Sequence, residues 1–103
     1  MTSLRLLTPA ARILLEAADY IETNGHCKHV YRVGNKACLL GAIDIVLEKE
    51  HAEPFRFHVV NAMEVYLGTV DVAQWNDAPA RTAEEVIAAL RSVALSLSTS
   101  EAK

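Results

Sequence analysis

The chain has 103 residues, 51% of them hydrophobic and 22% charged, and its formal net charge at pH 7 is −3. This length suits a single core, so we expect residues 1–103 to form one globular domain. Its ordered part is predicted to span about 4–97, with a flexible polar tail over 98–103. The negative charge argues against general nucleic-acid binding, which requires a basic surface. The high apolar fraction instead favours a homodimer or a protein partner.

Cysteine content and hydropathy bear on the compartment. Two cysteines, Cys27 and Cys38, are too few for a disulfide scaffold. Arg5, Arg12 and Glu16 interrupt the N-terminal leucines, so these do not form a signal-like apolar run. No stretch has the length needed to cross a bilayer. We therefore expect a cytoplasmic protein with two reduced thiols and no membrane contact.

The first predicted helix has clear signals at both ends. Thr8 is an N-cap, and Pro9 follows at the first helical position, where its missing N–H costs nothing. Apolar residues then recur at three- and four-residue spacing as far as Ile21. Gly25 ends the helix as the usual left-handed stop.

A short β-hairpin is predicted next. Residues 26–33 alternate in the period of a strand, and Gly34-Asn35 is a two-residue turn signal. This turn sets a register in which Tyr31 lies across the hairpin from Cys38.

The remaining chain is predicted to be mainly helical. Helices are expected over 38–47, from residue 54 to about 67, and over 83–97, with a short strand or extended connection over 69–75. The inward face of the third helix is expected to hold Val59, Val60, Met63, Tyr66 and Leu67. The sequence therefore predicts an α-rich α+β domain, with about four helices around one core and a small β-hairpin or two-to-three-stranded sheet.

Residues 74–85 hold the only tryptophan and the clearest helix start. Thr82 and Glu85 have the spacing of a capping box, in which each side chain accepts from the backbone N–H of the other residue. Residues 76–79 read as a turn, because Asn and Asp bond their own backbone and proline disfavours a helical residue before it. Trp75 is then expected to anchor this turn to the core.

Two interpretations of this stretch stay open. Caps and turns account for most of its residues, which favours a purely structural corner. The alternative is a recognition loop that binds a partner through Trp75, Asp77 and Arg81.

The motif Trp-Asn-Asp-x-Pro-x-Arg-Thr-x-x-Glu-Val, at residues 75–86, resembles a family of small uncharacterised proteins of actinobacteria and their phages. Cys-Leu-Leu-Gly-Ala, at residues 38–42, is similar to the other motif of that family, and the likeness extends loosely from Thr8 to Leu97. An aromatic residue often follows the glycine that ends the first helix in that family, and this chain has His26 there. The resemblance implies no established activity, but it implies a phage- or prophage-related protein acting in a host cytoplasm.

Cys38 is the best candidate for catalysis. It lies at the predicted start of a helix, where the helix dipole lowers the pKa of a thiol. His29 is one alternation beyond Tyr31 on the same strand face, and Asp77 would orient a histidine, giving a Cys-His-Asp arrangement. The alternative is that Cys38, beside two leucines, is a small buried apolar residue.

A metal site has weaker support. His26, Cys27 and His29 are close in sequence, and further histidines and a cysteine occur elsewhere in the chain. Zinc sites usually use two well-spaced pairs, and neighbours in an alternating strand point to opposite sides. We therefore expect neither a metal nor another cofactor.

The predicted hairpin is basic. No acidic residue occurs from position 23 to 43, whereas Lys28, Arg32 and Lys36 are positively charged. Lys28, Tyr31 and Arg32 are therefore candidate binding residues for an acidic protein surface or a phosphate. The alternative is a solvated strand whose lysines protect an exposed edge.

The leading hypothesis is a small intracellular protein-interaction module that binds a host protein, another partner or itself. The alternative, which we favour less, is a small cysteine-dependent enzyme using Cys38. A third hypothesis is a nucleic-acid accessory protein that uses the basic hairpin.

Overall fold

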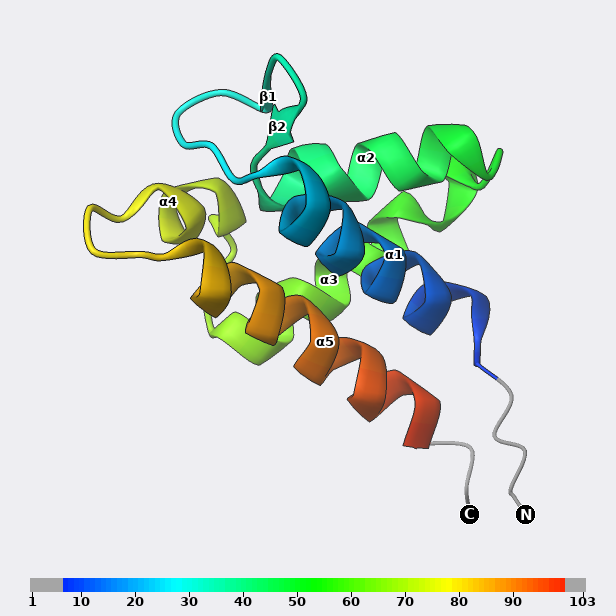
Figure 1. The fold of residues 1–103 in the computed structure, drawn as a ribbon. Helices are drawn as coiled ribbons and strands as arrows, with labels where there is room; N and C mark the ends of the chain where they lie inside the picture. The colour runs from blue at the N-terminus through cyan, green and yellow to red at the C-terminus, as the bar shows by residue number, and fades with distance from the viewer. Residues whose placement is uncertain (1–6, 100–103) are drawn as a thin grey trace.

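The computed structural model describes residues 7–99, so residues 4–6 of the predicted ordered part and 100–103 of the predicted tail lie outside the described residues. The described elements are, in chain order, α1 (Pro9–Asn24), β1 (Arg32–Val33), β2 (Lys36–Ala37), α2 (Leu39–Lys49), the 3₁₀ helix η1 (Glu53–Phe55), α3 (Arg56–Leu67), α4 (Val72–Asp77) and α5 (Ala83–Thr99) (Figure 1). The predicted α-rich α+β class is confirmed. Within residues 7–99 there are five α-helices rather than about four.

The core lies where α1 and α5 pack side by side, with α2 on α1 (Figure 1). α3 contacts all three of these helices and closes the core. Close packing of α1 follows from its small buried side chains, which are Ala10, Ala11, Ala17 and Ala18. The largest fully buried apolar side chains are Leu14, Ile21, Leu39, Ile43, Leu47, Val59, Met63, Val86 and Leu90. Burial of each large aliphatic side chain contributes roughly 1.5–3 kcal/mol, so this cluster dominates the stability of the fold.

Both ends of α1 and the start of α5 lie where the sequence predicts them. Thr8 Oγ1 accepts from the Ala11 N–H at 3.1 Å, and Gly25 ends α1 with a φ of 107°. In the capping box, the Thr82 N–H donates to Glu85 Oε1 and the Glu85 N–H donates to Thr82 Oγ1, both at 3.1 Å. α5 continues to Thr99, two residues beyond its predicted end.

The hairpin has the predicted turn and register. Arg32 pairs with Ala37 and Val33 with Lys36, around the Gly34-Asn35 turn. The Cys38 N–H donates to the Tyr31 carbonyl at 3.0 Å, so these two residues do lie opposite each other.

The predicted strand over 26–33 is mostly wrong. Only its last two residues are in a strand, and residues 28–31 bend outward as a loop. The reason is that Ala37 also pairs on its other side, accepting from the Cys27 N–H and donating to the Gly25 carbonyl, each at 3.2 Å. Because residues 25–27 occupy that side, the chain must loop out before it returns as β1.

The region from 69 to 75 is also not extended. Asp71 Oδ1 accepts from the Gln74 N–H at 2.9 Å and so caps a short helix, α4. The alternation of Val70 with Val72 therefore reflects one exposed residue before the helix and one buried residue at its start. Because α4 continues through Asp77, the predicted turn is confined to the residues after it.

α3 follows its prediction in part. It begins at Arg56 rather than at residue 54, because Glu53–Phe55 form the 3₁₀ helix η1, and Val60 and Leu67 are only half-buried. Val59 and Met63 are buried and Gly68 ends the helix in the left-handed conformation. Tyr66, which was predicted to face inward, is exposed. It lies about 60° of helical rotation from Met63, at the margin of the buried face.

Candidate functional site

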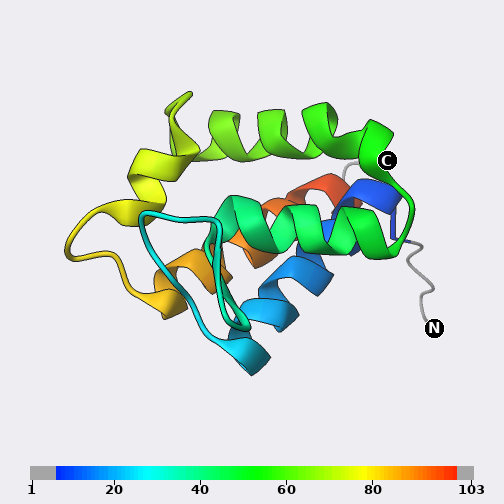
Figure 2. The same cartoon turned by 90° about the horizontal axis from the view of Figure 1, so that it is seen from above.

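Three segments meet at one end of the molecule: the loop 26–31, residues 37–41 at the start of α2, and residues 71–82 around α4. We call this region the corner. Figures 1 and 2 show the loop after α1 beside α4 and the connection to α5. The corner contains the predicted site residues except Arg32, which lies in β1, and it contains most of both sequence motifs.

Asn76 is the centre of the corner. It is buried, and its Oδ1 accepts from the Leu39 N–H at 3.0 Å and lies 2.7 Å from His26 Nε2. Its Nδ2 donates to the Cys27 carbonyl at 3.2 Å. Because the Leu39 N–H is a donor, the atom it faces must be the amide oxygen, so His26 donates from a protonated Nε2. One buried amide therefore joins α4 to α2 and to the loop.

Asp77 and Lys28 attach the loop to α4. Asp77 Oδ1 accepts from the His29 N–H and from Asn76 Nδ2, both at 2.9 Å. The Lys28 ammonium donates to the carbonyls of Ala78 and Pro79, at 2.8 and 3.1 Å. These carbonyls follow the C-terminal end of α4, where a cation is favoured. Two successive loop residues are thus fixed on the same helix end.

The His29 backbone has a φ of 72°, in the left-handed region. Such a conformation is uncommon for a residue other than glycine, and it persists only where the surroundings hold it. The bond to Asp77 does so here. Burial alone would raise the pKa of Asp77, but the hydrogen bonds from His29 and Asn76 and the nearby imidazoles outweigh it. Its pKa is therefore lowered, and the carboxylate is ionised at neutral pH.

The Cys-Leu-Leu-Gly sequence at 38–41 brings the loop against α2. Cys38 is the N-cap of α2, and its Sγ accepts from the Gly41 N–H at 3.3 Å. A Cβ on Gly41 would lie 2.1 Å from the Tyr31 carbonyl oxygen. Only glycine fits at this close approach of two backbones.

Both cysteines are free thiols. Cys38 is buried, and burial raises its pKa, although the N–H groups of Gly41 and Leu40 act in the opposite direction. Burial also raises the pKa of Cys27, whose sulfur lies 3.4 Å from the Val30 carbonyl. The thiolate form needed by a nucleophile is therefore disfavoured at both positions.

Trp75 and Arg81, two of the predicted binding residues, contact each other. The guanidinium lies 3.8 Å from the centre of the tryptophan ring, and Arg81 Nε donates to the Trp75 carbonyl at 2.9 Å. Arg81 Nη1 also lies 3.6 Å from Glu85 Oε1. Trp75 is half-buried and packs on the core, as expected of an anchor. These contacts brace the connection between α4 and α5.

A pocket of about 470 Å³ opens between the loop and α4. Its lining residues are His29, Val30, Tyr31, Cys38, Ala73 and Asp77. The structure thus brings all three catalytic candidates to one pocket. Within residues 7–99, however, His29 bonds to Asp77 and no hydrogen bond joins it to the Cys38 sulfur. The backbone N–H of His29 makes that bond, whereas its imidazole Nδ1 lies 3.7 Å from Asp77 Oδ2. Within the described residues, the pocket therefore holds neither a hydrogen-bonded imidazole–carboxylate pair nor an activated thiol.

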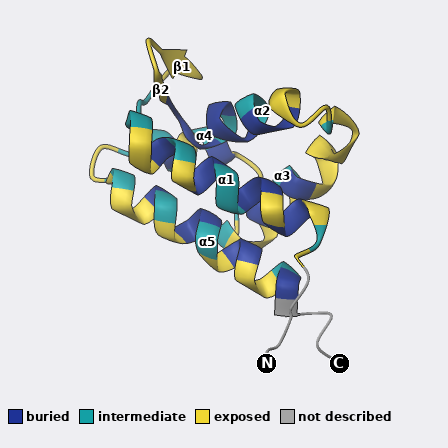
Figure 3. Cartoon of the chain, turned by 45° about the vertical axis from the view of Figure 1, so that its right-hand side comes forward, coloured by how far each residue is buried: buried dark blue, intermediate teal, exposed yellow. Residues whose placement is uncertain are grey.

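The three basic residues of the loop and hairpin differ in their contacts, and Lys36 is exposed. Lys28 is bonded to backbone carbonyls, and Arg32 Nη2 lies 3.4 Å from Glu48 Oε1. Beside exposed polar residues such as His29 and Lys36, the loop and hairpin expose three large apolar side chains: Val30 is 49%, Tyr31 57% and Val33 53% exposed. Figure 3 shows β1 as an exposed projection from the buried interior.

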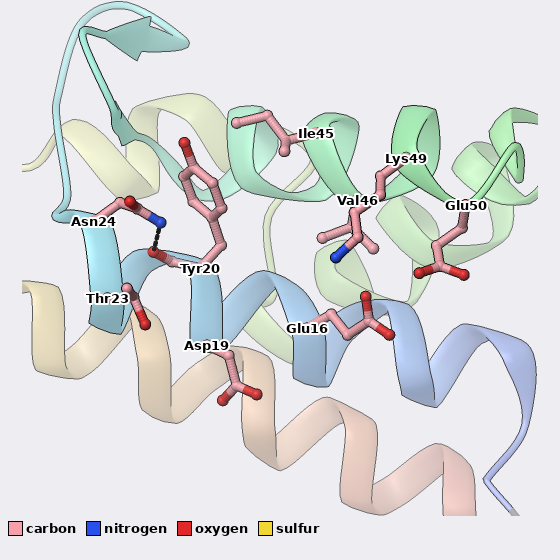
Figure 4. A pocket seen from close by; sticks show the side chains of 9 residues that line it. All are labelled: Glu16, Asp19, Tyr20, Thr23, Asn24, Ile45, Val46, Lys49 and Glu50. Carbon is pink, nitrogen blue, oxygen red and sulfur yellow. Dashed lines mark hydrogen bonds between the residues drawn. The ribbon is translucent and has the colours of Figure 1, made fainter.

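A second hollow, of about 450 Å³, lies between α1 and α2 and is lined by none of the predicted site residues (Figure 4). The Tyr20 ring stands between the two helices at one end. Of its carboxylates, Asp19 pairs with Arg91 at 2.9 Å. Burial, followed by the neighbouring Glu50 carboxylate, raises the pKa of Glu16. Asp19 is thus paired with a cation, whereas Glu16 faces another carboxylate across the groove.

Within the described part of the chain, no three His, Cys, Asp or Glu side chains are grouped so as to hold a metal ion. Nor does any helix over 7–99 combine the length and apolar character that crossing a membrane requires.

Sequence reasoning missed the roles of Asn76 and Lys28. The available signal was the N-cap at Asp71, which places Asn76 five residues later on a helix instead of in a turn. Nothing local indicates that Lys28 reaches carbonyls some 50 positions away, 2.8 Å from its ammonium in the nearer case.

Fold and corner together define a small α-rich α+β protein that holds a loop rigidly beside a pocket. The chain belongs to the family of unknown function DUF6197, whose model matches residues 6–95. This match confirms the expectation of an uncharacterised family. No curated protein and no solved structure matches the chain.

Proposed function

We propose that this protein is an interaction module that binds a partner protein through Val30, Tyr31 and Val33. The observation that carries the proposal is that these three side chains are about half exposed on a loop and hairpin of fixed backbone. Large apolar side chains cost free energy in water and gain it when a partner covers them. Tyrosine is among the residues that contribute most to protein interfaces.

The fixed backbone supports this proposal further. Hydrogen bonds from Lys28 and the His29 N–H, and to the carbonyls of Cys27 and Tyr31, hold the loop along its length. Binding by a preorganised loop loses less conformational entropy than binding by a flexible one. If the polar network served only to join the helices, the loop that it holds would not need large apolar side chains exposed to solvent.

The other hypotheses have less support. Nucleic-acid binding requires a broad basic surface, whereas the chain has a net charge of −3. Of the three basic residues of the loop and hairpin, Lys28 and Arg32 already have partners, which leaves Lys36. Cysteine catalysis requires a thiolate with a nearby base, whereas burial raises the pKa of Cys38.

The resemblance of the tryptophan motif bears on where the partner is found. We propose that the protein is phage- or prophage-derived and acts in the cytoplasm of an actinobacterial host, on a host protein. Lysate from such a cell is therefore the source to use for capture.

The experiment compares three baits: the native chain, a Tyr31→Ser/Val33→Ser variant, and a Phe57→Ser/Val65→Ser control on α3. Proteins captured by each bait are identified by mass spectrometry, and the affinity of the purified partner is then measured. We expect the hairpin variant to lose about 2 kcal/mol, or roughly thirtyfold in affinity, and the control to lose little. Equal affinity of the native chain and the hairpin variant would contradict the proposal.

A second candidate is self-association through α3. Phe57 is 81% and Val65 74% exposed, and they lie two turns apart on one face of the helix. Light scattering across a concentration series tests this candidate with the same two variants. A mass that rises above 11.3 kDa in the native chain, but not in the Phe57→Ser/Val65→Ser variant, would support a homodimer.

A further inference from the structure

The two oxygens of Asp77 have different surroundings. Oδ1 accepts two hydrogen bonds, from the His29 N–H and from Asn76 Nδ2. Oδ2 lies 3.7 Å from His29 Nδ1, which is too long for a hydrogen bond. Within residues 7–99, Oδ2 therefore keeps acceptor capacity, and its carboxylate borders the pocket between the loop and α4.

The other walls of this pocket are mainly apolar. Val30 and Tyr31 line it from the loop, Ala73 from α4 and Cys38 from the start of α2. An ionised carboxylate beside apolar walls is less well solvated than one on an open surface, so a cation placed against it is bound more strongly. A ligand that matches the pocket has an apolar stem and a cationic end.

We propose that this pocket binds the side chain of a lysine on the partner protein. The alkyl stem of the lysine lies along Val30, Ala73 and the Tyr31 ring, and its ammonium donates to Asp77 Oδ2. Arginine fits less well, because its bidentate pairing needs both carboxylate oxygens and Oδ1 already has two donors. The assignment to a partner protein rests on the proposed function, whereas the preference for an alkylammonium rests on the pocket alone.

The low pKa of Asp77 agrees with this assignment. Hydrogen bonds from His29 and Asn76 keep the carboxylate charged at neutral pH despite its burial. The same bonds fix its orientation, so a ligand meets a preformed acceptor. His29 also lines the pocket, and its side chain is 77% exposed with Nδ1 3.7 Å from Oδ2.

The test titrates the full-length chain with Nα-acetyl-lysine N-methylamide and follows the backbone amide signals of His29, Ala73 and Asp77 by NMR. The matched probes carry norleucine, which has a similar stem without the charge, and arginine. We expect saturable shifts with the lysine probe, and affinities at least about tenfold lower for the other two. Equal binding of the norleucine probe, or no saturable shift with the lysine probe, would overturn the proposal.

Two variants assign the binding to this pocket. Asp77→Asn removes the charge but keeps an oxygen that accepts from the His29 N–H, and it should weaken the lysine probe at least about tenfold. Ala73→Leu fills the pocket without touching the hydrogen bonds of the corner, and it should also abolish binding. Thermal melts check that both variants fold. Lysine binding that persists in both folded variants would show that the pocket is not the site.

Failure of this inference differs from failure of the proposed function. A lysine probe that binds the native chain and not Asp77→Asn supports the pocket even where partner capture is independent of Tyr31. A lysine probe that does not bind contradicts the proposed lysine site, even where capture of the partner protein depends on Tyr31.

Discussion

The core between α1, α2 and α5 and the corner around Asn76 are stabilised in different ways. Buried core side chains are almost all aliphatic or alanine, and their stability comes from area and packing. The corner depends on polar groups, each with a specific partner, and on one glycine where two backbones meet. Swaps of similar size in a core usually cost less than about 1.5 kcal/mol. In the corner, we expect even such swaps to be costly.

Gly41→Ala should have the largest effect. Its Cβ would lie 2.1 Å from the Tyr31 carbonyl oxygen, and a backbone atom cannot move aside as a flexible side chain does. We expect a loss of about 4 kcal/mol, above the usual range for overpacking. Chemical denaturation of the variant measures it.

Gly34→Ala is the matched control for this prediction. Gly34 has a positive φ of 60°, but a Cβ there would meet no atom within 4 Å. It should therefore lose only about 1–2 kcal/mol, the cost of a left-handed alanine. Equal losses at the two glycines would mean that the contact with Tyr31 is not tight.

Asn76→Leu should cost about 3 kcal/mol, although a leucine of similar size is easily buried. It leaves the Leu39 N–H, the Cys27 carbonyl and the His26 ring without their partner, and unpaired buried polar groups cost about 1–3 kcal/mol each. The control in the core is Leu90→Met, which should cost less than about 1.5 kcal/mol. Denaturation midpoints compare the two. A smaller loss at Asn76 than at Leu90 would reverse the contrast between the regions.

The same contrast explains what the sequence predicts. The caps at Thr8 and Thr82 and the turn at Gly34-Asn35 involve residues within a few positions, so local patterns reveal them. Helical periodicity likewise identified most of the core. Asn76 instead contacts residues 37 to 50 positions away, and no local pattern indicates those contacts.

The candidate site was predictable in part for the same reason. The hairpin register correctly placed Tyr31 opposite Cys38, and His29 and Asp77 do reach the same pocket. The course of the loop was not predictable, because the pairing of Ala37 on both sides depends on how the chain returns from α1. The hydrogen bonds from Lys28 to the carbonyls of Ala78 and Pro79 were not predictable for the same reason.

Thr82→Ala tests a local contribution beside the corner. The variant loses the hydroxyl that accepts from the Glu85 N–H, and this should cost about 1 kcal/mol. Thr23→Ala, at an exposed helical position, should change stability by less than about 0.5 kcal/mol. Thermal melts distinguish the two variants. An unchanged midpoint for Thr82→Ala would show that the capping box adds no stability.

Glu16→Gln should have the smallest effect, and it concerns the solvated rim between α1 and α2. Burial, then charge repulsion from Glu50 and the hydrogen bond shared with it, raise the pKa of Glu16 above 4.5, against the weaker influence of Lys49 and Arg12. Because the folded state holds this proton more tightly than the unfolded chain, the stabilising contribution is complete below the unfolded pKa. It is lost as the pH rises through the folded pKa.

Glutamine cannot ionise, so Glu16→Gln should escape that loss. At pH 7 we expect it to exceed the native chain in stability by less than about 0.5 kcal/mol, and at a pH below 4.5 the advantage should vanish. Melting temperatures across this pH range measure the difference.

The Glu50→Gln variant tests the cause of the raised pKa. Carboxyl NMR should find a lower pKa for Glu16 in this variant, because the repelling charge is gone. If the difference in melting temperature between Glu16→Gln and the native chain does not change with pH, then Glu16 has the same pKa in the folded and unfolded states. A small effect of Glu16→Gln together with a large loss of stability in Asn76→Leu would show that the polar interactions that matter most for stability are those around Asn76.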